Sequence, residues 1–340
     1  MTDNKWYLST GNEADTVIST RIRLARNIAG IPFPSRMSAQ QLSEVNRLVK
    51  NAIFSDPSAK DEYTYVEMDS LNSVTVAAMV ERHLISPEFA RMTDGHALIL
   101  SKDESVSIMI CEEDHIRIQV MCAGLDLKGA YERADKIDQL LGSHINFAFN
   151  ERLGYLTECP TNLGTGLRAS LMLHLPALEA CNAIDRLAAT VDKIGLTIRG
   201  TYGEGSKALA SMYQLSNQVT LGISEQTAID NLAAIAMQTM SQERAARESL
   251  DRDALDDAIY RSLGLLKYAR SMSGSEFMEL ISKVRLGIAT GLIKEYSLAT
   301  VMQLIIECGA GAVQEAARRE MEPMERDRKR AEIIRTRLAS

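Results

Sequence analysis

The segment of the chain with the clearest chemical potential joins a thiol to a glycine-containing loop. Residues 159–170 are Cys-Pro-Thr-Asn-Leu-Gly-Thr-Gly-Leu-Arg-Ala-Ser. The pattern predicts a helix over residues 167–178, with Arg168 in its first turn. Backbone N–H groups at the start of such a helix would attract an anion and favour the ionised form of a thiol beside them. Neither Lys-Ser nor Lys-Thr follows the glycines, so this is not a Walker A phosphate loop.

Arginines and acidic residues recur in three other short segments. These are Ser-Thr-Arg-Ile-Arg at 19–23, Glu-Glu-Asp-His-Ile-Arg at 112–117 and Arg-Gly-Thr-Tyr-Gly-Glu at 199–204. Guanidinium groups stay charged and donate paired hydrogen bonds to phosphate oxygens. A single arginine is usually a solvated surface charge. Several fixed arginines around one site would supply the charge neutralisation that phosphoryl transfer needs.

The elements that must position these residues are strands in the first two-thirds of the chain. Residues 17–24 and 115–120 alternate between apolar and polar side chains, so each strand directs its arginines away from its apolar face. We expect further strands at 105–110 and 217–221. We expect helices at 39–54, 125–142 and 177–194.

From about residue 224 the pattern becomes helical only. Ser224-Glu225-Gln226 is typical of a helix start, and apolar residues follow at helical spacing. Similar patterns occupy residues 255–269, 277–288 and 298–308, and Cys308-Gly309 is a plausible helix end. The sequence therefore predicts an α+β unit, residues 1–223, followed by an all-helical unit, residues 224–340.

Composition limits the function classes. The chain has 340 residues, 46% of them hydrophobic, and a formal net charge of −7, which argues against nucleic acid as the main partner. No long apolar stretch or signal-peptide core is present, so we expect neither membrane insertion nor export. The five cysteines show no Cys-x-x-Cys spacing, so we expect no disulfide framework and no protein metal site, in a reducing cytoplasm.

Together the four segments resemble the signature of the phosphagen (ATP:guanidino) kinases, in the order found in that family. The resemblance implies a catalytic domain with a mostly antiparallel sheet flanked by helices. It also implies binding of ATP with Mg²⁺, the metal being inferred from the reaction. The positions that match nucleotide-binding positions of the family are Ser19, Thr20, Arg21, Ile22, Arg23, His83, Arg117, Arg168, Ala169, Ser170, Leu171, Met172, Arg199, Gly200, Thr201, Tyr202, Gly203 and Glu204.

The resemblance also assigns the guanidine site. Glu113 matches the catalytic glutamate, and Glu204 matches a second carboxylate that holds the substrate. A guanidinium is a poor nucleophile until a base takes its proton. A Glu-Glu-Asp run alone is usually a solvated turn, but here it leads into the strand that carries Arg117, and its acids would raise each other's proton affinity. Cys159 matches a thiolate beside the guanidine, for which we expect a positioning role.

Departures from the family pattern bear on the substrate. Kinases of small guanidines have a helical domain before the first arginine segment. That segment begins here at residue 19, so we expect this domain to be missing. Tyr202 stands where an arginine is usual, and Cys111 where an asparagine is frequent. This combination is similar to the bacterial protein-arginine kinases (McsB type), which implies that arginine residues of proteins are phosphorylated. A kinase of free arginine and a non-catalytic phosphoarginine-binding adaptor are the alternatives.

The C-terminal segment contains one further motif. Arg326, Asp327, Arg330 and Ala331 fit an Arg-Asp-x-x-Arg-Ala element, which in that branch implies a regulatory phosphoarginine site. The alternative is a solvated amphipathic helix with Ala331 packed inward. The same resemblance implies a homodimer and a role in the stress response. It implies as partners a heat-shock transcription repressor, an activating zinc-binding adaptor and a Clp-type protease.

Overall fold

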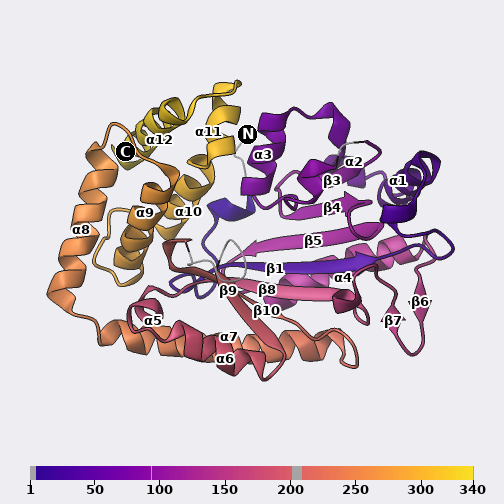
Figure 1. The fold of residues 1–340 in the computed structure, drawn as a ribbon, viewed down its shortest axis with the longest axis horizontal. Coiled ribbons are helices and arrows are strands. Elements are labelled where there is room, and N and C mark those ends of the chain that lie inside the picture. Colours follow the sequence, from indigo (N-terminus) through magenta and orange to yellow (C-terminus); the bar gives the residue numbers. More distant parts are fainter. Residues whose placement is uncertain (1–4, 93, 201–208, 340) are drawn as a thin grey trace.

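The centre of the molecule is one antiparallel sheet, in which the order of the strands differs from their order in the sequence (Figure 1). The computed structural model describes residues 5–92, 94–200 and 209–339. The eight strands lie in the order β2-β3-β4-β5-β1-β8-β10-β9. Their bounds are β1 Val17–Arg26, β2 Tyr63–Glu67, β3 Ala97–Ser101, β4 Val106–Ile110, β5 Ile116–Ala123, β8 Leu167–His174, β9 Leu196–Gly200 and β10 Met212–Asn217. The predicted α+β class with a mostly antiparallel sheet is confirmed.

The two alternating arginine segments form neighbouring central strands. β1 pairs with β5, so that Arg23 lies opposite Gln119 and Ala25 opposite Arg117. Apolar side chains such as Ile22, Leu24 and Ile118 are fully buried on the other face. The period-two pattern therefore placed both segments in the sheet and aimed their arginines to one side.

The helix predicted for residues 167–178 is wrong. Residues Leu167–His174 form strand β8, between β1 and β10, and a short helix α5, Pro176–Ala180, begins only after it. Leu167, Ala169, Leu171 and Leu173 are buried in the core on one face, and Arg168, Ser170 and Met172 between them lie on the other face. The anion site expected at a helix start beside Cys159 is therefore absent from this described segment, because a strand follows the loop.

Two other predicted boundaries also need correction. The strand expected at 217–221 is instead β10, which ends at Asn217. The single helix expected at 177–194 is two helices, α5 and α6, Ile184–Asp192. Asn182 between them has a positive φ of 53°, a conformation that ends the first helix. The other predicted strands and helices of the first unit are confirmed within a few residues.

One face of the sheet is covered by three helices: α1 Ala39–Ile53, α4 Leu127–Gly142 and α7 Glu225–Glu248. Val49 of α1, Ala134 of α4 and Leu232 of α7 are fully buried against the strands. α7 begins as predicted, because Ser224 caps it by accepting a hydrogen bond from the backbone N–H of Thr227 at 3.1 Å. The boundary predicted near residue 223 lies directly before this helix, and the division into two domains stays a prediction.

A smaller apolar cluster covers part of the opposite face. Leu98 of β3 and Met109 of β4 pack there against Met79, Leu84 and Phe89. Met79 belongs to α3, Ser73–Glu81, and Leu84 follows this helix directly. Met109 lies opposite Arg117 in the sheet, so this cluster holds the end of α3 on the arginine-bearing face.

The remaining helices gather at one end of the molecule (Figure 1). They are α8 Arg252–Tyr268, α9 Gly274–Ala289, α10 Leu298–Glu307, α11 Ala310–Ala317 and α12 Pro323–Ala339, which surround a separate core that includes Phe277, Ile281 and Ile334. Side chains of Asp251, Ser273 and Ser297 cap the first three of them. The predicted all-helical character of this region is confirmed.

Charged side chains attach the helical end to the sheet. Glu81 of α3 accepts hydrogen bonds from the backbone N–H groups of Gly311 at 2.8 Å and Ala312 at 2.9 Å, at the N-terminus of α11. Arg285 of α9 donates to the carbonyls of Ala14 and Asp15, just before β1. In the part of the chain that the structure describes, no helix is long and apolar enough to span a membrane.

Candidate active site

Five arginines from four strands project from the same face of the sheet. Arg21 and Arg23 lie on β1, and Arg168 on β8 is the direct partner of Arg23. Gln119 also lies opposite Arg23, which puts Arg117, two residues along β5, on that face as well. Arg199 of β9 lies opposite Gln214 of β10, and Gln214 lies opposite Met172 of β8. Arg199 therefore projects from the same face. Antiparallel register thus gathers arginines that are up to 178 residues apart in sequence (199 − 21).

Three of these arginines, Arg21, Arg23 and Arg168, lie buried among like charges. Burial, and next the positive charges of Arg168 and Arg117, lower the pKa of Arg21 to about 10. Burial together with its arginine neighbours lowers the pKa of Arg23 well below its ordinary value. Burial, Arg199 and Arg117 lower the pKa of Arg168, while Cys159 acts in the opposite direction.

Two of the same arginines carry unused donors. The Nε atoms of Arg23 and Arg168 are buried, and neither has a hydrogen-bond partner among the described residues. Clustered cations with orphaned N–H groups are costly unless an anion joins them. The arginine face therefore fits a ligand with several negative charges, such as a nucleotide triphosphate.

Arg21 is held in place by groups from neighbouring strands. Its Nη2 donates to Oε1 of Gln214 at 2.8 Å, and its Nε donates to Oγ of Ser170 at 3.4 Å. His83 has a positive φ of 59°. Burial and the charge of Arg21 lower the pKa of His83 to about 4, which keeps this ring neutral beside the arginines. The structure thus places His83 near the cluster.

The two glutamates before β5 share Arg117 but differ in burial. Arg117 donates to Oε1 of Glu112 at 2.7 Å and to Oε2 of Glu113 at 3.1 Å. Glu112 is buried and also accepts a hydrogen bond from the hydroxyl of Ser86. The Glu113 side chain is 40% exposed. Burial is the main cause that raises the pKa of Glu113, with Arg117 opposing it and the neighbouring acids assisting.

The Cys159 loop is fixed beside these glutamates. Asp114 is buried and accepts hydrogen bonds from the backbone N–H of Glu158 at 2.8 Å and from Nδ2 of Asn27 at 2.6 Å. Asn162, in the short helix Pro160–Asn162, lies with Nδ2 3.5 Å from Oε2 of Glu113. Cys159 itself is part-exposed, with Sγ 3.0 Å from Oγ1 of Thr161. Glu113, Cys159 and the arginine face therefore meet at one end of the sheet.

The other predicted site positions divide by face. Ser19, Ser170 and Met172 share the arginine face, as their register shows. Thr20, Ile22, Ala169 and Leu171 are buried on the helix-covered face. Thr20 there accepts a hydrogen bond from the backbone N–H of Asp126 and donates to the carbonyl of Gly124. Gly200 ends β9, and Thr201, Tyr202, Gly203 and Glu204 lie outside the described residues.

The sequence interpretation gave no role to several residues that support this site. Gln214 and Asn162 each contact a predicted site residue, and Asp114 accepts a hydrogen bond from the backbone N–H of Glu158, directly before Cys159. Asp114 and Asn162 stand inside motifs that had already been recognised, so proximity in sequence could have indicated them. Gln214 had no such signal, because only the pairing of β10 with β8 and β9 brings it to Arg21.

The C-terminal motif lies on α12, in contact with two other helices. Arg330 is buried and donates to the carbonyls of Cys308 at 2.7 Å and Met272 at 2.9 Å, and to Oδ1 of Asp327 at 2.6 Å. Ala331 packs into the helical core. Arg326 donates to the carbonyl of Met321 at 3.3 Å and lines a cavity of about 540 Å³. The described contacts are structural, and the phosphoarginine role stays a prediction.

Known proteins share both the sheet and the helical end. Residues 44–246 match the family described as ATP:guanido phosphotransferase, C-terminal catalytic domain, and residues 252–340 match the protein-arginine kinase McsB C-terminal domain. The chain is 43% identical to protein-arginine kinase of Halothermothrix orenii over 98% of this chain and 96% of that one. It is 44% identical to protein-arginine kinase of Brevibacillus brevis, over 98% of this chain and 95% of that one.

Solved structures agree on the catalytic part. The duplicated taurocyamine kinase of Schistosoma mansoni superimposes with a TM-score of 0.62 at 27% identity, over 72% of this chain and 37% of that longer chain. Lombricine kinase gives a TM-score of 0.61 at 26% identity, over 71% of this chain and 70% of its own. The five-arginine face, the glutamates before β5 and the matches along both parts of the chain lead to one conclusion: this protein belongs to the ATP:guanido phosphotransferase family of enzymes, in its protein-arginine kinase branch.

Proposed function

We propose that this protein transfers the γ-phosphoryl group of ATP to the guanidino group of arginine residues in proteins. The observation that carries the proposal is the arginine face, on which the buried Nε donors of Arg23 and Arg168 have no partner among the described residues, with Glu113 and the Cys159 loop at its edge. Relatives that are 43–44% identical over nearly the whole chain are named protein-arginine kinase. That likeness favours protein arginine over a free guanidine as the acceptor.

The nucleotide phosphates would lie over Arg21, Arg23, Arg117, Arg168 and Arg199. Their fixed guanidinium groups would neutralise the charge that spreads over the transferred phosphoryl group. Mg²⁺, carried on the nucleotide phosphates, would supply further charge neutralisation there. The unpaired Nε atoms of Arg23 and Arg168 would gain acceptors when the phosphates bind.

Glu113 would act as the base. Its carboxylate takes a proton from the target guanidinium as the nitrogen attacks phosphorus. An N–P bond forms, the bond between the γ-phosphorus and the bridging oxygen breaks, and ADP leaves with the bonding electron pair. The raised pKa of Glu113 improves its basicity, and its 40% exposure leaves room for an incoming side chain. Cys159 and, outside the described residues, Glu204 would position the guanidinium.

A kinase of free arginine remains the second candidate, because the same chemistry would serve a small guanidine. The family resemblance further supports proposals that concern the biological role. In these, the protein is a cytoplasmic homodimer of the stress response, its phosphorylated substrates include a heat-shock transcription repressor, and phosphorylation marks proteins for a Clp-type protease. A zinc-binding adaptor would activate it, and the Arg326–Ala331 motif on α12 would bind phosphoarginine.

The experiment that tests the proposal measures ADP release with MgATP and either an unfolded arginine-rich protein or free arginine, at equal guanidine concentration. We expect turnover on the protein to exceed turnover on free arginine. The opposite ranking would favour the second candidate. Binding of phosphoarginine without ADP release on any substrate would favour a non-catalytic adaptor.

A further inference from the structure

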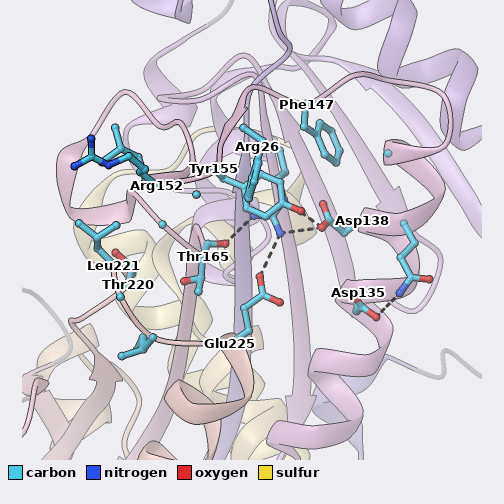
Figure 2. A pocket seen from close by; sticks show the side chains of 18 of the residues that line it. Arg26, Asp135, Asp138, Phe147, Arg152, Tyr155, Thr165, Thr220, Leu221 and Glu225 are labelled. Atoms are coloured by element: carbon cyan, nitrogen blue, oxygen red, sulfur yellow. Dashed lines mark hydrogen bonds and ion pairs between the residues drawn. The ribbon is translucent and has the colours of Figure 1, made fainter.

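A cavity of about 710 Å³ lies beside the loop that follows Cys159 (Figure 2). Arg26 of its lining belongs to the face of β1 opposite that of Arg21 and Arg23. Its walls are the end of β1, the last turns of α4, the loop residues Gly164 and Thr165, the 220–225 segment, and the hairpin of β6, Phe149–Asn150, and β7, Gly154–Tyr155. This hairpin stands at the opposite end of the molecule from the helical region (Figure 1). The cavity contains none of the residues assigned above to ATP or to catalysis.

Arg26 lies at the base of the cavity but has no donor left for a ligand. It donates to Oδ2 of Asp138 from Nε at 3.1 Å and from Nη2 at 2.8 Å, to Oε1 of Glu225 at 3.4 Å, and to the carbonyls of Ala25 and Thr165 at 3.0 and 2.9 Å. Its guanidinium carbon is 3.5 Å from the ring centroid of Tyr155. Figure 2 shows the contacts of Arg26 with Asp138, Glu225 and Thr165. Arg26 is therefore fixed as part of the wall.

The lining of the cavity holds three carboxylates and two arginines, Arg26 and the exposed Arg152, so negative charge is in excess. Asp135, Asp138 and Glu225 all line it. Asp138 is only 7% exposed, and its Oδ1 has no hydrogen-bond partner in the described ranges of the chain. Burial raises the pKa of Asp138, which is the expected response of a carboxylate short of positive partners. A cation is the ligand charge that this base favours.

The mouth of the cavity carries large apolar side chains as well as the exposed Arg152. Phe149, Leu153 and Leu221 line it and are 58%, 42% and 48% exposed. Large apolar side chains gathered around one opening are typical of a surface that meets another chain. A small free cation would use the acidic base but leave this rim uncovered. A polypeptide with a basic residue next to an apolar one would use both.

We propose that this cavity is an exosite that holds a basic side chain of the protein substrate, with an adjacent apolar residue packed on Phe149, Leu153 and Leu221. The inference rests on the proposed protein-arginine kinase activity. Gly164 of the cavity and Cys159 of the active site are five residues apart in one loop, so at most about 18 Å of chain separates them. About five extended substrate residues would span that distance, between the residue in the exosite and the arginine that is phosphorylated.

The test compares a long and a minimal substrate in the full-length protein. The variants are Asp135→Lys, which reverses the charge at the base, and Leu153→Ser with Leu221→Ser, which makes the rim polar. Asp230→Lys is a matched control: Asp230 of α7 accepts a hydrogen bond from Gln226 at 2.8 Å, as Asp135 of α4 does from Gln139 at 2.7 Å. Met237→Ser, at a position 63% exposed on α7, controls for the apolar changes.

We expect the exosite variants to raise KM for an unfolded arginine-rich protein about fivefold to tenfold, with kcat within about twofold of wild type. KM for N-acetyl-arginine amide, which is too short to reach the cavity, should not change, and neither control variant should change either substrate. Equal effects on both substrates, or no effect on either, would overturn the exosite. Transfer by the wild type to the small substrate alone, or to neither, would overturn the proposed function itself and the exosite with it.

Discussion

Replacing Arg23 with methionine is expected to stabilise the free protein and to weaken its binding of ATP. Arg23 is held among like charges: burial and the arginines at 21, 117 and 168 all lower its pKa. Methionine keeps much of the aliphatic volume and removes both the charge and the orphaned Nε. The same change removes one of the cations that we assign to the phosphates.

The magnitude follows from the register. Arg23 and Arg168 are directly opposed on β1 and β8, so their Cβ atoms are about 5 Å apart and their guanidinium groups on the order of 7 Å. At an effective dielectric constant of about 20, two unit charges at that distance repel by about 2 kcal/mol. The carboxylate of Glu112 offsets part of this repulsion. We therefore expect the free variant to gain about 1–2 kcal/mol, or roughly 2–4 °C in Tm.

With ATP bound, the substitution is expected to have the opposite effect on stability, because the variant gains less from the ligand. At an ATP concentration of 100 times Kd, the wild type gains about 2.7 kcal/mol from binding. If the variant binds about thirtyfold more weakly, the same concentration supplies only about 0.9 kcal/mol. Thermal unfolding of wild type and variant, each with and without MgATP, measures both terms. Arg186→Met, on the exposed side of α6, is the control and should stay within about 0.5 kcal/mol of wild type in either condition.

Two results would refute this reasoning. A free Arg23→Met protein that is less stable than wild type would show that Arg23 is compensated, and that the arginine face is a structural ion network. If MgATP raised the Tm of the variant as much as that of the wild type, the nucleotide would bind elsewhere.

The remaining predictions concern the glutamates, the thiol and the C-terminal motif. Glu113→Gln should lower kcat about 10²- to 10⁴-fold. The unfolding midpoint should change little, because the Glu113 side chain is 40% exposed. The variant should also lose the acidic limb of the pH–rate profile, which lies at a higher pH than for an ordinary glutamate because the pKa of Glu113 is raised. Glu112→Gln should instead cost about 3 kcal/mol of stability in denaturant unfolding, because it breaks a buried pair with Arg117. Cys159→Ser should raise KM for the guanidine substrate more than KM for ATP in steady-state kinetics. Arg330→Met should lower the stability of the helical end by about 2–4 kcal/mol, seen as earlier loss of helical circular dichroism, since it leaves two carbonyls and Asp327 without their donor.

The sequence predicted the central strands well because they alternate without interruption. Residues 17–24 and 115–120 have apolar side chains on one side and arginines on the other, and both are strands with that orientation in the structure. The change to helices only, from residue 224 onward, was equally clear, since the capping residue Ser224 precedes apolar residues at helical spacing.

The sequence interpretation failed at β8 because two signals competed. Leu, Ala and Met are strong helix formers, and this propensity suggested a helix over residues 167–178. The same segment has apolar residues at every second position from Leu167 to Leu173, all buried on one face, and the sheet decided between the two signals. The consequence for function is direct, because a strand places Arg168 opposite Arg23.

The supporting residues of the site could not be predicted, because contacts between segments far apart in the sequence bring them there. Gln214 is brought to Arg21, and Asn162 to Glu113, by strand order and loop closure that no local pattern encodes. The cavity beside the loop that follows Cys159 is likewise assembled from segments between β1 and α7 that are nearly 200 residues apart. Motif spacing identified the chemistry, whereas the geometry that joins the motifs required the fold.

The measurement that tests the central claim most directly is phosphorus NMR of wild type and Glu113→Gln after incubation with MgATP. An unfolded arginine-rich protein and free arginine serve as parallel substrates, at neutral to mildly alkaline pH, where the acid-labile N–P bond survives. The account predicts an N–P resonance on the protein with the wild type and its loss with Glu113→Gln. A resonance mainly on free arginine, or one on the protein that persists at full rate in the Glu113 variant, would contradict it.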